Sequence, residues 1–217
     1  MTPPPLQLEW LGRLAYAPAL ARQEALVAAK IADPALPDTV FLLEHEPVYT
    51  IGRTPDRSSL LAPDALPHPV ETIARGGQAT YHGPGQLVGY PIMDLSRRGR
   101  DLHRYLRFLE EVLILALADH SIVAARREEL TGVWVGARKI ASIGVGVRRW
   151  VSMHGFAINV TAESLAPFSA ITPCGIAGVE MTAAEPEFGQ AIGVEGFART
   201  VGTRFRASLD TLLPMED

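Results

Sequence analysis

The chain has 217 residues, of which 47% are hydrophobic and 20% are charged, as in an ordinary globular domain, and its formal net charge is −4. This acidic balance argues against a general nucleic-acid binder, and no run approaches the roughly 18 apolar residues of a membrane span, so we expect neither nucleic acid nor membrane as a partner. The start Met-Thr-Pro-Pro-Pro lacks the basic and apolar regions of a secretory signal, and the single cysteine suits a reducing compartment. We therefore expect one cytoplasmic domain over residues 1–217.

The first third of the chain predicts a helix followed by strands. Residues 15–32 carry a mildly apolar helical face. Residues 39–43 and 48–51 read as short strands that flank a loop at 44–47. The stretch 55–70 is rich in proline and polar residues and indicates a further loop.

The second half holds the clearest helix. Apolar residues recur at helical spacing from Leu102 to Ala116, and Asp101 is well placed to cap the first turn. A strand-rich stretch follows at 133–160, and a last helix is predicted at about 195–213. Because short turns separate the strands, we expect an α/β (α+β) fold with a mixed, largely antiparallel sheet flanked by helices.

A glycine-rich segment at 75–92 predicts a β-hairpin whose turn is Gly83-Pro84-Gly85. So many glycines cost conformational entropy, which leaves two interpretations. The segment is either a twisted structural hairpin or a cradle for a ligand, with Arg75 and His82 supplying polar contacts. It is not a nucleotide-binding loop, because neither a P-loop nor a Rossmann glycine pattern occurs. Strand alternation places Thr80 and His82 on one face and Ala79 and Tyr81 on the other.

Cys174 is the only cysteine and lies in the sequence Thr-Pro-Cys-Gly at 172–175. A lone cysteine excludes an internal disulfide and a Cys-x-x-Cys metal site. It can be a packed hydrophobic residue, a reactive nucleophile or a site of intermolecular pairing. A nucleophilic thiol needs a proton acceptor. His45, His82 and His154 are candidates, although we expect structural roles for His45 and His154.

Lys139 is the other candidate partner for the thiol. Residues 133–147 predict a second hairpin, in which Lys139 shares a face with Ala141, Ile143 and Val145 unless a bulge inverts the alternation. A lysine on an apolar face either extends its ammonium group into water or is desolvated, and desolvation lowers its pKa and makes it a usable base.

Six segments carry a pattern that is more specific together than any one alone. They are residues 44–52, 75–86, 90–91, 138–144, 154–159 and 173–176. In order and spacing these segments resemble the lipoyl(octanoyl) transferase family, and the resemblance covers most of the chain. It implies the fold of the biotin/lipoate protein ligases, with a mixed sheet flanked by helices.

The resemblance also implies an activity and a site. The activity is transfer of an octanoyl group from octanoyl-acyl carrier protein, through a cysteine thioester, to the ε-amine of a lysine on a lipoyl domain, the first step of protein lipoylation. The family's cysteine falls on Cys174. Its lysine, which lowers the thiol pKa and shuttles the proton, falls on Lys139. The family's substrate-binding positions fall on Arg75, Gly76, Gly77, Gln78, Ala79, Thr80, Tyr81, His82, Ser142, Ile143, Gly144, Gly155, Phe156 and Ala157.

The resemblance further implies partners and the absence of cofactors. The donor is octanoyl-acyl carrier protein, and the acceptors are the apo lipoyl domains of 2-oxoacid dehydrogenase complexes and the glycine cleavage H protein. Neither ATP nor a metal is expected, since transfer from a thioester to an amide runs downhill. Backbone N–H groups at Cys174 and Gly175, or along 142–144, would stabilise the oxyanion.

Three other functions remain open at this point. The first is an ATP-dependent lipoate or biotin ligase, which needs no nucleophilic cysteine. The second is a non-catalytic module that binds lipoyl domains, in which Cys174 only packs. The third is a cysteine hydrolase that uses Cys174 and His82.

Arginine residues offer a possible docking surface for an acidic carrier protein on this net-negative chain. The alternative is a solvated charged face. The residues are Arg97, Arg98, Arg100, Arg104 and Arg107 around the start of the second helix, and Arg148 and Arg149 near the lysine strand.

Overall fold

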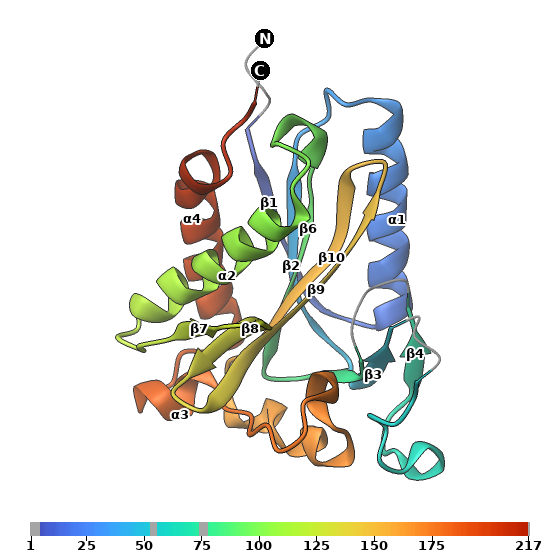
Figure 1. Cartoon of the computed structure of the whole chain (residues 1–217), viewed down its shortest axis with the longest axis vertical. Helices are drawn as coiled ribbons and strands as arrows, with labels where there is room; N and C mark the ends of the chain where they lie inside the picture. The colour runs from blue at the N-terminus through green and yellow to red at the C-terminus, as the bar shows by residue number, and fades with distance from the viewer. Residues whose placement is uncertain (1–4, 53–55, 74–77, 217) are drawn as a thin grey trace.

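The computed structural model describes residues 5–52, 56–73 and 78–216 and contains two sheets (Figure 1). In the large sheet, seven strands lie in the order β1-β2-β6-β10-β9-β8-β7, and a small sheet has the order β4-β3-β5. The large sheet is built from β1 Gln7–Leu14, β2 Thr39–His45, β6 Gln86–Ile92, β10 Val151–Asn159, β9 Arg138–Arg148, β8 Leu130–Val135 and β7 Ala125–Arg127. The small sheet is built from β3 Val48–Ile51, β4 Val70–Thr72 and β5 Thr80–His82.

The pairing of the strands is mostly antiparallel. Only β1 with β2 and β3 with β4 run parallel among the strand pairs of the described residues. The other pairs are antiparallel, including the long β9–β10 hairpin. The prediction of a mixed, largely antiparallel sheet flanked by helices is therefore confirmed.

Helices cover both faces of the large sheet. Helix α1 (Tyr16–Ala32) packs on β6 and β10 from one side, and α2 (Leu102–Ala118) and α4 (Val194–Leu212) pack on each other and on the opposite side (Figure 1). A short helix α3 (Ala184–Phe188) precedes α4. In the part of the chain that the structure describes, each helix is too short or too polar to cross a bilayer.

Strand β2 shows how the sequence builds these two layers. Val40 and Leu42 belong to the core under α2 and α4, whereas Phe41 and Leu43 belong to the core under α1. Successive side chains of a strand point to opposite faces, so a continuous apolar run is buried on both sides. The central strands of the sheet thus connect two hydrophobic cores.

The predicted helices are confirmed with small shifts at their ends. Asp101 caps α2, since its carboxylate accepts a hydrogen bond from the Arg104 N–H at 3.0 Å. The predicted strand at 39–43 extends to His45, because Leu14 of β1 pairs with His45 and prolongs the ladder. The loop predicted at 44–47 is correspondingly shorter.

The predicted hairpin at 75–92 is wrong. Strand β5 pairs with β3 of the small sheet, and β6 pairs with β2 and β10 of the large sheet. The turn at 83–85 therefore carries the chain from one sheet to the other. Gly85 has a φ of +81°, its N–H donates to the Glu44 carboxylate at 2.8 Å, and a Cβ there would lie 2.2 Å from Thr161 Oγ1.

Candidate active site

A cavity of about 390 Å³ lies beside the α1 face of the large sheet, and both candidate catalytic residues, Cys174 and Lys139, line it. Its walls are mainly apolar and include Tyr16, Val88 and Tyr90. Nine further substrate-binding positions expected from the sequence line it: Gln78, Thr80, His82, Ser142, Ile143, Gly144, Gly155, Phe156 and Ala157.

Two of the other expected positions, Ala79 and Tyr81, do not line the cavity. Ala79 and Tyr81 face away from the cavity, as strand alternation predicts, and pack with Tyr49 and Phe168 in a separate apolar cluster. Arg75, Gly76 and Gly77 lie outside the described residues.

Within the described ranges, no group of three or more His, Cys, Asp and Glu side chains is arranged to hold a metal ion.

Cys174 sits in a tight turn, Pro173–Gly175, that presents its thiol to the cavity. Its φ of 56° and ψ of 18° are left-handed, a conformation that costs a non-glycine residue on the order of 1–3 kcal/mol. The side chain is partly exposed, and its Sγ lies 3.4 Å from Ser142 Oγ. This strained, accessible placement differs from that of a cysteine packed in a core.

The two backbone donors expected to stabilise an oxyanion are already engaged. The Cys174 N–H donates to the Ala79 carbonyl at 2.9 Å, and the Gly175 N–H donates to Thr172 at 3.0 Å. These two hydrogen bonds fix the turn instead. Gly175 also packs against Gln78, because a Cβ added at Gly175 would lie 2.8 Å from Gln78 Cγ. The expectation for these two N–H groups is therefore wrong in this structure.

Lys139 lies on the opposite strand face from the one that simple alternation predicts, as the alternative with a bulge allowed. Trp134 pairs with Lys139 and Val133 pairs with Ala141, so one extra residue, Ile140, bulges from β9. The bulge inverts the alternation and places Lys139 on the cavity side with Ser142.

The lysine side chain is almost completely buried, at 1% exposure. Its Nζ donates to the Thr131 carbonyl at 3.1 Å and lies 4.7 Å from the centre of the Trp134 ring. No carboxylate of the described residues lies within 4.0 Å of this Nζ. The amine is thus held by a carbonyl dipole and an aromatic face rather than by a salt bridge.

A chain of buried amides connects His82 with the backbone of Lys139. His82 Nδ1 lies 2.8 Å from Gln86 Oε1 and therefore donates to it, and Gln86 Nε2 donates to Asn159 Oδ1 at 2.9 Å. Asn159 Nδ2 donates to the Thr182 carbonyl at 3.0 Å, and the Thr182 N–H donates to the Lys139 carbonyl at 2.9 Å. Gln86, Asn159 and Thr182 had no assigned role in the sequence analysis, although polar side chains at the ends of buried strands are a signal of such a network.

His45 has a structural environment. Its ring lies between the Leu14 carbonyl, 2.8 Å from Nδ1, and the Tyr90 hydroxyl, 2.7 Å from Nε2. Burial desolvates the imidazolium form and lowers the pKa of His45 to about 4, so the ring is neutral, donates to Leu14 and accepts from Tyr90. The histidine thereby orients a tyrosine that lines the cavity.

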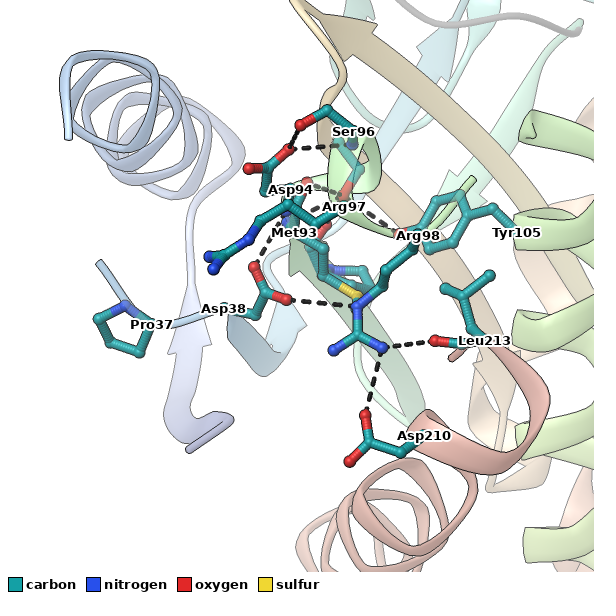
Figure 2. A network of polar contacts seen from close by, with 12 residues as sticks. Pro37, Asp38, Met93, Asp94, Ser96, Arg97, Arg98, Tyr105, Asp210 and Leu213 are labelled. Carbon is teal, nitrogen blue, oxygen red and sulfur yellow. Dashed lines mark hydrogen bonds and ion pairs between the residues drawn. The ribbon is translucent and has the colours of Figure 1, made fainter. Parts of the chain in front are cut away.

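In the arginine group before α2, Arg98 is committed to internal contacts (Figure 2). Arg98 is 5% exposed, and its guanidinium faces Asp38 at 3.7 Å and Asp210 at 3.3 Å and donates to the Leu213 carbonyl. The segment 93–101 lies at the end of the large sheet opposite the orange segment that contains Cys174 (Figure 1). Arg98 is therefore a structural residue, and its expected place in a docking surface is wrong.

Comparisons with known proteins agree with this arrangement. A family model, "Lipoyl protein ligase A/B catalytic domain", matches residues 15–206. A protein of Geobacter metallireducens named octanoyltransferase is 52% identical over 204 residues, which is 94% of this chain and 93% of that protein. One of Geotalea uraniireducens with the same name is 51% identical over 207 residues, 95% of this chain and 94% of that protein.

Solved structures show the same fold at much lower identity. A putative lipoate protein ligase of Thermoplasma acidophilum superimposes with a TM-score of 0.70 at 14% identity, over 95% of this chain and 85% of that one. The biotin protein ligase of Aquifex aeolicus superimposes with a TM-score of 0.60 at 13% identity, over 95% of this chain and 72% of that one. By its sequence and its fold, this chain belongs to the lipoyl protein ligase A/B catalytic domain family.

Proposed function

We propose that this chain is an octanoyltransferase that carries the acyl group on Cys174 between a carrier-protein thioester and a lysine of a lipoyl domain. The observation that supports this most directly is the accessible thiol of Cys174 at an apolar cavity that also holds the buried amine of Lys139. The names of relatives about half identical over nearly the whole chain support the same activity.

The first half-reaction loads the enzyme. Lys139 accepts the proton of the Cys174 thiol, and the thiolate attacks the carbonyl carbon of the octanoyl thioester. A C–S bond to Cys174 forms, the C–S bond to the carrier's pantetheine breaks, and the leaving thiolate takes the proton back from Lys139. Ser142, at 3.4 Å from the sulfur, donates a hydrogen bond to the thiolate before the attack.

The second half-reaction discharges the enzyme. The ε-amine of the acceptor lysine attacks the thioester carbon, an amide C–N bond forms, and the C–S bond to Cys174 breaks. The amine loses one proton to Lys139, which returns it to the Cys174 sulfur. Since an amide is more stable than a thioester, neither ATP nor a metal enters the cycle.

The cavity suits a medium-length acyl chain. Its volume of about 390 Å³ lies near the lower end of the range for small-molecule sites, roughly 300–1,000 Å³. Ala157, Val88 and Phe156 give it apolar walls, and Ser142 contacts the sulfur. Gly155 has a different function, because a Cβ there would lie 2.2 Å from the Gly89 carbonyl of the neighbouring strand.

The proposed partners are octanoyl-acyl carrier protein as the donor and apo lipoyl domains as acceptors, including those of 2-oxoacid dehydrogenase complexes and the glycine cleavage H protein. Family membership supports a lipoyl-domain acceptor. A related archaeal lipoate protein ligase has been described together with its E2 lipoyl domain. That structure matches this chain with a TM-score of 0.69 at 15% identity, which supports the shared fold alone.

The test is intact mass spectrometry of the pure protein after incubation with octanoyl-acyl carrier protein in the absence of ATP. We expect one octanoyl adduct, which is absent from Cys174→Ser and is discharged when an apo lipoyl domain is added. Because Cys174 is the only cysteine, this variant removes every thiol of the chain. Lipoyl-domain modification that needs ATP and free octanoate, with no adduct on the protein, would instead indicate a ligase. Adduct loss to water without an acceptor would indicate a hydrolase.

A further inference from the structure

One peptide group of β8 contacts both a buried carboxylate and the catalytic amine. The N–H of Gly132 donates to Glu110 Oε1 at 3.0 Å, and the carbonyl oxygen of the same peptide, that of Thr131, accepts from Lys139 Nζ at 3.1 Å. The carboxylate, the peptide and the amine therefore form one continuous hydrogen-bonded series. In such a series each bond polarises the next, so the carboxylate makes the Thr131 oxygen a stronger acceptor.

Glu110 is an unusual residue for its position, because its side chain is fully buried on α2, at 0% exposure. Its Oε2 accepts from Arg107 at 2.7 Å and from Arg126 Nε at 3.0 Å. Arg126 also pairs with Glu111 at 2.6 Å, so two guanidinium groups face two carboxylates and the cluster is neutral as a whole. The arginines occupy Oε2 and leave Oε1 to the Gly132 N–H.

Because Gly132 has no side chain, the end of the Lys139 side chain can pack directly against its backbone. An added Cβ would lie 3.0 Å from Lys139 Cε and 3.2 Å from Nζ, and 2.5 Å from the Ala141 carbonyl oxygen. The φ of Gly132 is +131°, a conformation that side chains rarely adopt. The lysine thus lies along a peptide that has no side chain on that side and whose N–H is fixed by Glu110.

We propose that Glu110 is a positioning residue for Lys139. Glu110 acts through the Thr131–Gly132 peptide and fixes the position of the Lys139 amine in the cavity. This inference rests on the proposed function, since it assigns a role in proton transfer between Cys174 and Lys139. Glu110 itself does not line the cavity. Its effect on the reaction therefore passes entirely through the lysine.

A purely structural role for Glu110 would have a different signature. In that case the carboxylate only ties α2 to β7 and β8, and its removal lowers stability without changing the thiol of Cys174 in the folded protein. Glu111 provides the matched control, because it lies on the same helix and also pairs with Arg126, whereas the Gly132 N–H donates to Glu110.

The experiment measures how fast iodoacetamide alkylates Cys174 as a function of pH in Glu110→Gln, Glu111→Gln and Lys139→Met. We expect Lys139→Met to move the midpoint of this profile, Glu110→Gln to move it in the same direction by a smaller amount, and Glu111→Gln to leave it at the wild-type value. Octanoyl loading of Glu110→Gln at saturating donor should fall about tenfold, with the KM for the donor changed by less than about twofold.

The outcomes separate this inference from the proposed function. A midpoint that moves in Lys139→Met but is the same in Glu110→Gln, Glu111→Gln and wild type would overturn the role of Glu110 and leave the cysteine–lysine pair intact. A midpoint that Lys139→Met does not move would overturn the pair itself and the inference with it. Thermal unfolding of each variant shows that the comparison is made on folded protein, and Glu110→Asp, which keeps the charge but draws the oxygen back from Gly132, gives a second test.

Discussion

Substitution of Gly132 by alanine should disturb both the stability of the hairpin β8–β9 and the placement of Lys139. The new Cβ would lie 2.5 Å from a backbone oxygen, that of Ala141, which belongs to the paired strand and has little freedom to move. It would also force alanine into a φ of +131°. Backbone strain of about 1–3 kcal/mol and overpacking of about 1–3 kcal/mol predict a total loss of roughly 2–6 kcal/mol.

Gly136 in the same hairpin provides the control for this effect. It too has a positive φ, +56°, but no atom lies within 4 Å of its Cβ position. Gly136→Ala should therefore cost only about 1–2 kcal/mol, from the left-handed backbone alone. The difference between the two variants isolates the steric requirement at Gly132.

Urea denaturation measures both losses, and octanoyl loading of Cys174 measures the effect on the site. We expect Gly132→Ala to unfold at clearly lower urea than Gly136→Ala with a similar m-value. Folded Gly132→Ala should load at least about tenfold more slowly, because its Cβ displaces the end of Lys139. Equal stability of the two variants together with wild-type loading by Gly132→Ala would refute the argument that this glycine makes room for the lysine.

Three further changes have defined outcomes. His45 has a pKa of about 4 in the folded protein against 6.5 in the unfolded chain. The stability that the neutral ring contributes is therefore fully present above pH 6.5 and is lost as pH falls toward 4. Urea denaturation over this pH range should show the free energy of unfolding fall by up to about 3 kcal/mol, a fall that His45→Gln lacks. Arg98→Met should cost about 1–3 kcal/mol in thermal or urea unfolding, because the buried Leu213 carbonyl loses its donor while Asp38 keeps its pair with Lys30, whereas Arg97→Met should cost less than about 0.5 kcal/mol. Ser142→Ala should slow octanoyl loading about tenfold, measured by quenched-flow mass spectrometry, and a wild-type rate would contradict its contact with the thiolate.

The helices could be predicted from the sequence because their apolar spacing is local information. The pattern from Leu102 onward predicts α2 within two residues of its observed end. Sheet pairing is not local in the same way. The turn at Gly83-Pro84-Gly85 looks like a hairpin turn, yet Gly85 contacts Glu44 and Thr161, which lie far away in the sequence and direct β6 into the other sheet.

The site was predictable in its residue types and less so in its geometry. Cys174 and Lys139 stand out in the sequence because a lone cysteine and a lysine among apolar residues need an explanation. The face of Lys139 depends on the bulge at Ile140, which arises from the pairing of Val133 and Trp134 with β9 and not from β9 alone. Strand alternation read from one strand therefore could not decide between the two faces, and the alternative with a bulge is the one observed.

The helical spacing of the sequence places Glu110 at a position where a polar residue is unexpected. It lies four residues after Leu106 and three before Leu113, so it stands on the apolar stripe of α2, where a carboxylate is costly to bury without partners. Such a position predicts a buried polar network. Which groups complete the network could not be read from the sequence, because Arg126 and Gly132 reach Glu110 only through the fold of β7 and β8.

The separation of Glu110 from Lys139 by one peptide has a chemical consequence. A carboxylate in direct contact with a buried lysine would hold the amine as an ammonium ion and occupy the donor that, in the proposed mechanism, exchanges a proton with Cys174. With the Thr131–Gly132 peptide between them, the carboxylate orients the amine through a dipole. The Trp134 ring, at 4.7 Å from Nζ, adds a weak attraction while the amine carries a proton. Lys139 is thereby held in place by groups that cannot take its proton, which is the condition for the role that we propose, in which the lysine accepts a proton and returns it within each half-reaction.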